Sequence, residues 1–124
     1  MWNVRGEYLD MSMIQRSGDM LTASGAGGIN EIQYAALLMM IAKVTGYEPG
    51  VFTHFVANEQ IYDRHMDNAQ EMLRRAEVMA DDMQKPVLVL HKEKGCRFED
   101  ITIEDFEMVD YNPMKPQLTF ELGI

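Results

Sequence analysis

Four side chains in this sequence could together bind a small phosphate-bearing ligand. Arg16 has a planar guanidinium that can hold a phosphate through two parallel hydrogen bonds, and Ser17 adds a hydroxyl donor beside it. The amide of Asn30 both donates and accepts hydrogen bonds, so it can match the edge of a nucleobase. Tyr62 offers a phenolic hydroxyl. These residue types indicate a binding site only if the fold brings them into one cleft.

Each of these residues could instead have an ordinary structural role. Arg16 could be a surface arginine at the end of a strand, and Tyr62 could be a core residue. Asp19 could begin a glycine-rich loop as an Asx turn. Asn30 is a good helix N-cap residue, with Gln33 where a capping-box partner would stand, and this role is compatible with ligand binding.

The first half of the chain should supply the elements that carry Arg16 and Asn30. Residues 2–4 and 8–15 show a mostly alternating pattern and predict two strands joined by a tight turn at residues 5–7. Residues 18–29 contain four glycines and predict a loop. A helix is expected from Asn30 to about Thr45, with Gly46 as its stop. Its stretch from Tyr34 to Ala42 is apolar on every face, which predicts burial all round and therefore cover from missing chain or a partner subunit.

The second half predicts further strands and one amphipathic helix. Strands are expected at residues 51–56, 86–91, 106–109 and 118–122. Asp63 should begin a helix that runs to about Met83, with one apolar stripe at helical spacing: Met66, Ala69, Leu73, Ala76 and Ala80. We therefore predict one domain over residues 1–124. Its fold class is α+β, with a mixed or antiparallel sheet packed against a long buried helix and a second, amphipathic helix.

Composition excludes several classes of function. The chain has 11 Lys and Arg against 20 Asp and Glu, and this net charge of −9 argues against binding a nucleic-acid polymer. The longest apolar run is nine residues, and no signal peptide is evident, so we expect a soluble, cytoplasmic protein with no membrane partner. The single cysteine, Cys96, excludes an internal disulfide and a multi-cysteine metal cluster, and no metal is expected.

Five motifs in order carry a resemblance to a known family. They are Gln15-Arg16-Ser17-Gly18-Asp19; Asn30 with Tyr34; Asn58 to His65; Phe98-Glu99-Asp100 with Asp105-Phe106-Glu107; and Tyr111-Asn112-Pro113. In this order and spacing they resemble the C-terminal part of thymidylate synthases, over essentially the whole chain. The family transfers a methyl group to dUMP from 5,10-methylenetetrahydrofolate as co-substrate.

The resemblance implies a role for each candidate residue. Arg16 and Ser17 would hold the 5′-phosphate of dUMP, Asn30 would read uracil at O4 and N3, and Tyr62 would meet the 3′-hydroxyl. The implied substrate-binding set is Arg16, Ser17, Gly18, Asp19, Asn30, Gln60, Ile61 and Tyr62. Asp19 and Asn30 are also the implied catalytic residues, and Asp19, Gly123 and Ile124 the implied folate-binding residues. His65 is expected to have only a structural role.

The sequence departs from the family pattern at several points. Gln60 and Asn58 stand where the family usually has histidine and aspartate, and the loop before Asn30 is longer than usual. The family's nucleophilic cysteine belongs to a Pro-Cys stretch upstream of the Gln-Arg-Ser strand, and Cys96 reads as an ordinary turn residue. We therefore expect this chain alone to be inactive.

Two alternatives remain open at this stage. The chain could be a non-catalytic nucleotide-binding or structural half-fold. It could also be a fragment of a pyrimidine hydroxymethylase, although Asn30 favours uracil where those enzymes are expected to use aspartate. Under the main interpretation, dUMP and folate are the small-molecule partners. A homodimer, or pairing with the missing N-terminal part, is also expected.

Overall fold

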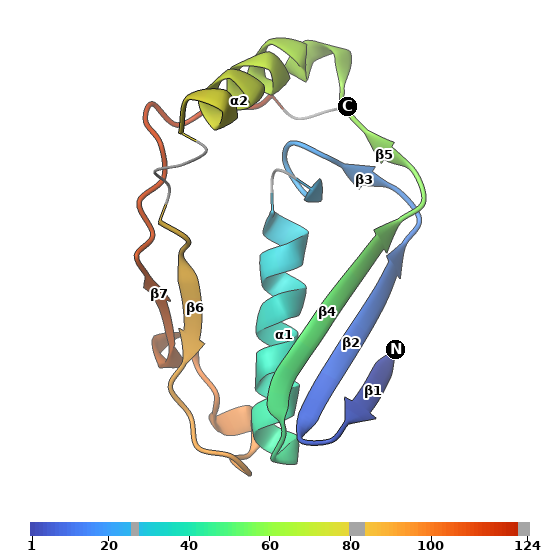
Figure 1. The fold of residues 1–124 in the computed structure, drawn as a ribbon, viewed down its shortest axis with the longest axis vertical. Helices are drawn as coiled ribbons and strands as arrows, with labels where there is room; N and C mark the ends of the chain where they lie inside the picture. The colour runs from blue at the N-terminus through green and yellow to red at the C-terminus, as the bar shows by residue number, and fades with distance from the viewer. Residues whose placement is uncertain (26–27, 80–83, 122–124) are drawn as a thin grey trace.

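The computed structural model describes residues 1–25, 28–79 and 84–121, and its secondary structure is mixed α and β (Figure 1). The elements in chain order are β1 (Trp2–Arg5), β2 (Tyr8–Gln15), β3 (Gly18–Asp19), α1 (Ile29–Thr45), β4 (Glu48–Val56), β5 (Glu59–Gln60), η2 (Asp63–His65), α2 (Met66–Met79), β6 (Val87–Leu90), η3 (Phe98–Asp100), η4 (Ile103–Asp105) and β7 (Phe106–Val109). The predicted α+β class is confirmed. Among the described residues, no helix has the length and apolar character needed to cross a bilayer.

The main sheet has the strand order β1-β2-β4 and is mixed. β1 and β2 pair antiparallel across the predicted tight turn, where Gly6 adopts φ 63. β2 and β4 pair parallel, and α1 forms the crossover between them against one face of the sheet (Figure 1). The sheet therefore places the ends of β2 and β4 side by side, next to the beginning of α1.

A β-bulge lengthens β4 beyond the predicted strand. The pairing shifts from Leu9↔Pro49 to Met11↔Phe52, so β4 has one residue more than β2 over this stretch. The Asp10 carboxylate accepts a hydrogen bond from the Val51 N–H (2.8 Å) and so satisfies the bulged backbone. The strand consequently begins at Glu48 instead of residue 51.

The beginning of α1 differs from the prediction, whereas its end agrees. The helix begins at Ile29 after Gly28, which adopts φ 66, so Asn30 is not the N-cap and no side chain caps this end. Asn30 instead lies in the first turn, and its N–H donates to the Ala23 carbonyl (2.8 Å). Gly46 ends the helix in the left-handed conformation, as predicted.

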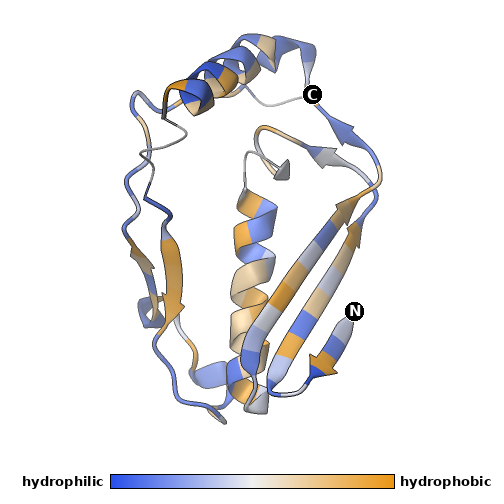
Figure 2. Cartoon of the chain, viewed as in Figure 1, coloured by the Kyte–Doolittle hydropathy of each residue, from blue (hydrophilic) through white to orange (hydrophobic). Residues whose placement is uncertain are grey.

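The described residues of this chain do not bury α1 on every side. Only Leu38 and Ala42 are buried, and they form the core with Leu9 and Met11 of β2. The rest of the apolar stretch is partly buried, because the sheet covers one side of α1 and β6 lies on another (Figures 1 and 2). The helix has more apolar surface than the described residues cover.

The second half contains the predicted β6–β7 pair and a shorter second helix. β6 and β7 pair antiparallel, with Val87 opposite Val109. The helix expected from Asp63 begins as the 3₁₀ turn η2 and continues as α2 to Met79, while residues 80–83 lie outside the described part. Of the predicted apolar stripe, Ala80 lies outside the described residues, and among Met66, Ala69, Leu73 and Ala76 only Ala69 is buried.

The strand predicted at residues 118–122 does not form over 118–121, and residue 122 lies outside the described part. Two carbonyls of this segment accept hydrogen bonds from side chains instead of from a neighbouring strand. His65 Nε2 lies 2.9 Å from the Glu121 carbonyl, and Asn68 Nδ2 donates to the Thr119 carbonyl at 2.9 Å. The segment is thus tied to η2 and α2.

Candidate functional site

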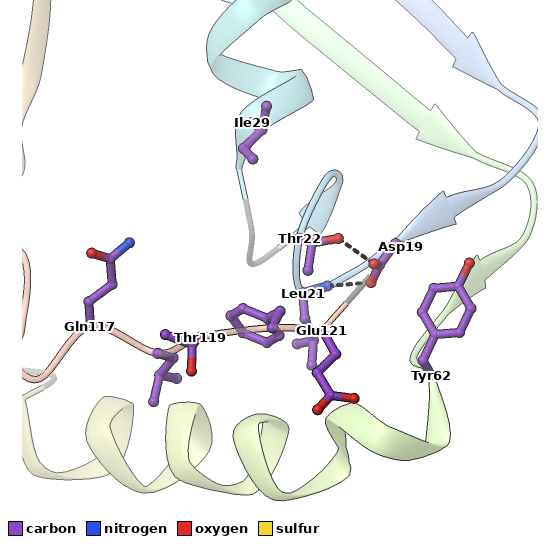
Figure 3. Close-up of a pocket in the computed structure, with 10 residues that line it drawn as sticks. Asp19, Leu21, Thr22, Ile29, Tyr62, Gln117, Thr119 and Glu121 are labelled. Atoms are coloured by element: carbon purple, nitrogen blue, oxygen red, sulfur yellow. Dashed lines mark hydrogen bonds between the residues drawn. The ribbon is translucent and has the colours of Figure 1, made fainter. Parts of the chain in front are cut away.

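Two cavities share Asp19 and Tyr62 as wall residues. The smaller, of about 210 Å³, is lined by Gln15, Ser17, Gly18, Asp19, Ala23, Gln60 and Tyr62. The larger, of about 690 Å³, is lined by Asp19, Leu21, Thr22, Ile29, Tyr62 and residues 117–121 (Figure 3). Five of the residues proposed from sequence therefore lie around one cleft: Ser17, Gly18, Asp19, Gln60 and Tyr62.

The short parallel pair β3–β5 is what brings these residues together. Gly18 lies opposite Glu59 and Asp19 opposite Gln60. The Gly18 N–H donates to the Asn58 carbonyl (3.0 Å), and the Met20 N–H donates to the Gln60 carbonyl (2.9 Å). Two sequence motifs about forty residues apart thus become neighbours, as β3 and β5 show in Figure 1.

No side chain fits at Gly18, because Ser24 and Glu59 come close to it. Ser24 is fully buried, and its hydroxyl donates to Glu59 Oε1 at 2.5 Å. A Cβ on Gly18 would lie 2.0 Å from Ser24 Oγ and 2.9 Å from Glu59 Oε1. The absence of a side chain at Gly18 therefore lets this hydrogen bond tie the loop after β3 to β5.

Asp19 begins the loop as an Asx turn and also faces both cavities. Its Oδ1 accepts from the Leu21 N–H (3.2 Å), and its Oδ2 accepts from the Thr22 hydroxyl (Figure 3). Its carbonyl accepts from the N–H groups of Ala23 and Ser24. The structural role considered for Asp19 is therefore present, and it fixes the carboxylate beside Tyr62 in the cleft wall.

Asn30 lines neither cavity, but it hydrogen-bonds to Gln15, which lines the smaller one. Asn30 Nδ2 donates to Gln15 Oε1 (3.4 Å), and Gln15 Nε2 donates to the Ser17 carbonyl (2.8 Å). His54 Nε2 lies 3.1 Å from the same Gln15 oxygen, and His54 Nδ1 lies 2.7 Å from Glu31 Oε1. These contacts form one connected polar network on the wall of the cleft.

Sequence reasoning missed Gln15, His54 and Glu31. One signal was available, because β4 alternates between exposed and partly buried residues and His54 occupies a partly buried position. A histidine on the inward face of a strand needs polar partners. Which partners it finds depends on α1 and β2, which are 23 and 39 residues away along the chain.

Two of the expected binding residues, and Cys96, lie elsewhere. Arg16 is exposed and lines neither cavity. Successive side chains of an extended chain point to opposite sides, and its neighbours Gln15 and Ser17 are the ones that line the smaller cavity. Ile61 lines a separate apolar cavity beside α2. Gly123 and Ile124 fall outside the described residues.

Cys96 lies at the opposite end of α1. Its neighbour Gly95 donates its N–H to the Lys43 carbonyl, near the end of α1, whereas the site lies at the beginning of the helix. Thirteen residues of helix between Asn30 and Lys43 correspond to about 20 Å. Within residues 1–25, 28–79 and 84–121, no group of three or more His, Cys, Asp or Glu side chains is placed to hold a metal ion.

Comparison with known proteins shows the family of this chain. The family model described as thymidylate synthase matches residues 1–124. The chain belongs to the thymidylate synthase family. The resemblance found in the sequence is thus confirmed, and the family is one of methyltransferases.

Relatives and one solved structure show how much of a thymidylate synthase is present. A thymidylate synthase of Streptococcus suis is 50% identical over 122 residues, which is 98% of this chain and 41% of the relative. A thymidylate synthase of Streptococcus pneumoniae matches equally, at 50% over the same shares. The solved thermostable thymidylate synthase A from Bacillus subtilis is 34% identical, with a TM-score of 0.80 over 98% of this chain and 40% of that one. The chain therefore spans about two fifths of the length of these thymidylate synthases.

Proposed function

We propose that this chain forms the dUMP-binding wall of a thymidylate synthase site, in which dUMP is methylated to dTMP with 5,10-methylenetetrahydrofolate. The observation that carries the proposal is the parallel pairing of β3 with β5, which puts Ser17 to Asp19 beside Gln60 to Tyr62 around one cleft. Family membership supplies the reaction class, and the cleft is the place where the chain can take part in it.

The nucleotide would occupy the smaller cavity. Ser17 lies in the wall of this cavity and would offer its hydroxyl to the phosphate, and the exposed Arg16 at the adjoining strand end could turn its guanidinium onto the phosphate. Gln60 and Tyr62 offer an amide and a hydroxyl for the ribose. Asn30 would complete the set by donating to O4 of uracil and accepting from N3–H.

The folate would occupy the larger cavity. A volume of about 690 Å³ is in the range of sites for small molecules of this size. Asp19 belongs to both cavities, so it could face both the pyrimidine and the folate. Residues 117–121 form the opposite wall, and in this proposal Gly123 and Ile124 close the site over both ligands.

The chain alone is proposed to be inactive. Methyl transfer in this family requires a thiol that adds to C6 of uracil, and Cys96 lies at the far end of α1 from the cleft. The rest of the enzyme would supply the thiol, in the cytoplasm. It would also cover the apolar cavity of about 320 Å³ beside α2, which is lined by Met20, Leu21, Ile61, Ala69, Met72, Leu73 and Ala76.

Calorimetric titration of the chain with dUMP tests the binding role. We expect saturable binding that weakens about tenfold or more in Ser17→Ala, since the hydroxyl faces the proposed phosphate position. Tyr111→Phe serves as a control, because Tyr111 is exposed and lines neither cavity. Absence of any dUMP binding would refute the proposal, and preferential binding of dCMP would favour a hydroxymethylase. Tritium release from 5-labelled dUMP by the chain would contradict its proposed inactivity.

We also propose that the chain dimerises through the face of the main sheet opposite α1. Ile14 and Phe55 lie opposite each other on β2 and β4, and they are 67% and 60% exposed. Val51 adds a further exposed apolar side chain to β4. Light scattering at micromolar concentration should give a dimer mass that falls to the monomer mass in Phe55→Lys, because a charge there cannot be buried cheaply. A wild-type monomer would rule this interface out.

A further inference from the structure

The residues Glu31, His54, Gln15 and Asn30 form a polar relay from the first turn of α1, through β4 and β2, back to α1. It ends at the amide that would read the pyrimidine. Glu31 Oε1 lies 2.7 Å from His54 Nδ1, His54 Nε2 lies 3.1 Å from Gln15 Oε1, and Asn30 Nδ2 donates to the same oxygen at 3.4 Å. Glu31 and His54 come from elements far apart in sequence, so their contact is a product of the fold.

The direction of the Gln15 amide follows from its partners. The group on its other side is the Ser17 carbonyl, at 2.8 Å, and a carbonyl can only accept. The amine end of Gln15 must therefore face Ser17, which turns its oxygen toward His54 and Asn30. This assignment rests on donor and acceptor chemistry and not on distinguishing nitrogen from oxygen by shape.

The same chemistry fixes the protonation of His54. Its Nε2 faces the Gln15 oxygen, so Nε2 must carry a proton. Its Nδ1 faces the Glu31 carboxylate, which also accepts from the Gly25 N–H at 3.0 Å. If that carboxylate is ionised it accepts, and both ring nitrogens of His54 then act as hydrogen-bond donors.

Glu31 is in a setting that keeps it ionised. Burial raises the pKa of the Glu31 carboxyl, but the backbone N–H groups of Glu31 and Gly25 and the His54 ring outweigh burial and lower the pKa overall. The side chains of His54 and Glu31 are only 10% and 29% exposed, and Glu31 Oε2 is buried without a hydrogen-bond partner among the described residues. The Phe52 ring stacks on His54 at 6.0 Å and contributes no charge. Glu31 is therefore the one charged group that the described residues place in contact with His54.

We propose that the Glu31–His54 pair is a specificity-determining device that holds Asn30 in the orientation that selects uracil over cytosine; this inference rests on the proposed function. When His54 donates to the Gln15 oxygen, this oxygen stays in place and also accepts from the Asn30 amine. The Asn30 oxygen is then free to accept from the N–H of the pyrimidine ring. That order of donor and acceptor matches O4 and N3–H of uracil. A neutral His54 that accepted at Nε2 would compete with the Ser17 carbonyl for the Gln15 amine. Where His54 takes that amine, the Gln15 and Asn30 amides are reversed, and the reversed order matches cytosine. Glu31 and His54 are positioning residues here, since neither touches the base.

Measurement of the ring nitrogens of His54 tests the relay without any nucleotide. In ¹⁵N NMR at neutral pH, we expect both nitrogens of His54 to be protonated, and we expect Glu31→Gln to remove one proton. Glu107→Gln is the matched control, because Glu107 pairs with His91 at the same 2.7 Å while both side chains are 58% exposed. A singly protonated His54 in the wild-type chain overturns the proposal, whether or not dUMP binds.

The ratio of dUMP to dCMP affinity tests the consequence for specificity. We expect the ratio to fall about tenfold or more in Glu31→Gln and in His54→Phe, and to stay within about threefold in Glu107→Gln. His54→Gln keeps a donor toward Gln15 and should retain most of the preference, which separates loss of the donor from loss of folding. An unchanged ratio in a folded Glu31→Gln protein overturns the specificity role. If the wild type binds neither nucleotide, both the proposed function and this role fail, although the NMR result still decides the protonation of His54.

Discussion

Substitution of Gly18 by alanine tests the steric basis of the cleft. Gly18 does not need a positive φ, so an added methyl acts through its contacts alone. The methyl would lie 2.0 Å from Ser24 Oγ, where no Cβ can remain, so the buried Ser24 hydroxyl must leave its hydrogen bond to Glu59. Loss of a hydrogen bond to a charged group costs about 1.5–3 kcal/mol, and overpacking adds about 1–3 kcal/mol.

A smaller effect opposes these two terms. Replacing glycine by alanine stabilises by about 0.4–1 kcal/mol through the unfolded chain. The net loss expected for Gly18→Ala is therefore about 3 kcal/mol, or roughly 10 °C in Tm for a chain of this length. Urea unfolding followed by circular dichroism measures the free energy of unfolding directly.

The matched comparison is the double variant Gly18→Ala with Ser24→Ala. Ser24→Ala alone should cost about 2 kcal/mol, because it removes the same hydrogen bond to Glu59. In the double variant the clashing oxygen is absent, so the total loss should be about 2 kcal/mol, close to that of Ser24→Ala alone, instead of the sum of the two single losses. Additive losses, or a Gly18→Ala protein as stable as the wild type, would refute the argument that Ser24 is what excludes a side chain at Gly18.

Three further predictions concern other parts of the chain. Gly50→Ala should lower the free energy of unfolding, measured in urea, by about 2–3 kcal/mol. Adding Asp10→Ala to this variant should restore only part of the lost stability, because the methyl at position 50 also lies 2.9 Å from the Leu9 carbonyl. Two arginines on α2 lower the pKa of Glu71 to about 2, so its stabilising effect is present above about 4.5 and is lost as the pH falls toward 2. Glu71→Gln should therefore flatten the dependence of Tm on pH in that range, whereas the exposed Glu77→Gln should leave the slope unchanged. Tyr62→Phe should weaken dUMP binding about threefold to tenfold in calorimetry without lowering Tm, since the ring stays in place and only the hydroxyl is lost; an unaltered dUMP affinity would show that the hydroxyl does not meet the ligand.

Local sequence patterns were enough to predict several elements of this fold. The β1–β2 hairpin and the end of α1 at Gly46 each depend on a glycine that adopts positive φ, which a short stretch of sequence reveals. The β6–β7 strands follow from two short apolar runs. The motif at residues 15–19 and the one at 58–62 were expected to share one site, and the pairing of β3 with β5 makes these two motifs neighbours.

The failures of prediction have tertiary causes. Asn30 is a residue type that often caps helices, yet α1 begins at Ile29, one residue before Asn30, because Gly28 can adopt φ 66. The final strand was predicted from residues 118–122, but His65 and Asn68 take carbonyls of this segment as hydrogen-bond acceptors. The extra residue of β4 is stabilised by Asp10 from another strand. For the final strand and for β4 the deciding partner is remote in sequence, whereas for α1 it is the glycine just before the helix.

The hydrogen bonds between α2 and the C-terminal segment have a mechanical consequence. Arg75 Nη1 donates to the Pro116 carbonyl at 2.9 Å, and Asn68 and His65 hold the carbonyls of Thr119 and Glu121. Three hydrogen bonds, one from η2 and two from α2, thus join the segment to this part of the fold. Since residues 117–121 are a wall of the larger cavity, displacing this wall to widen the cavity must either break these hydrogen bonds or move η2 and α2 with it.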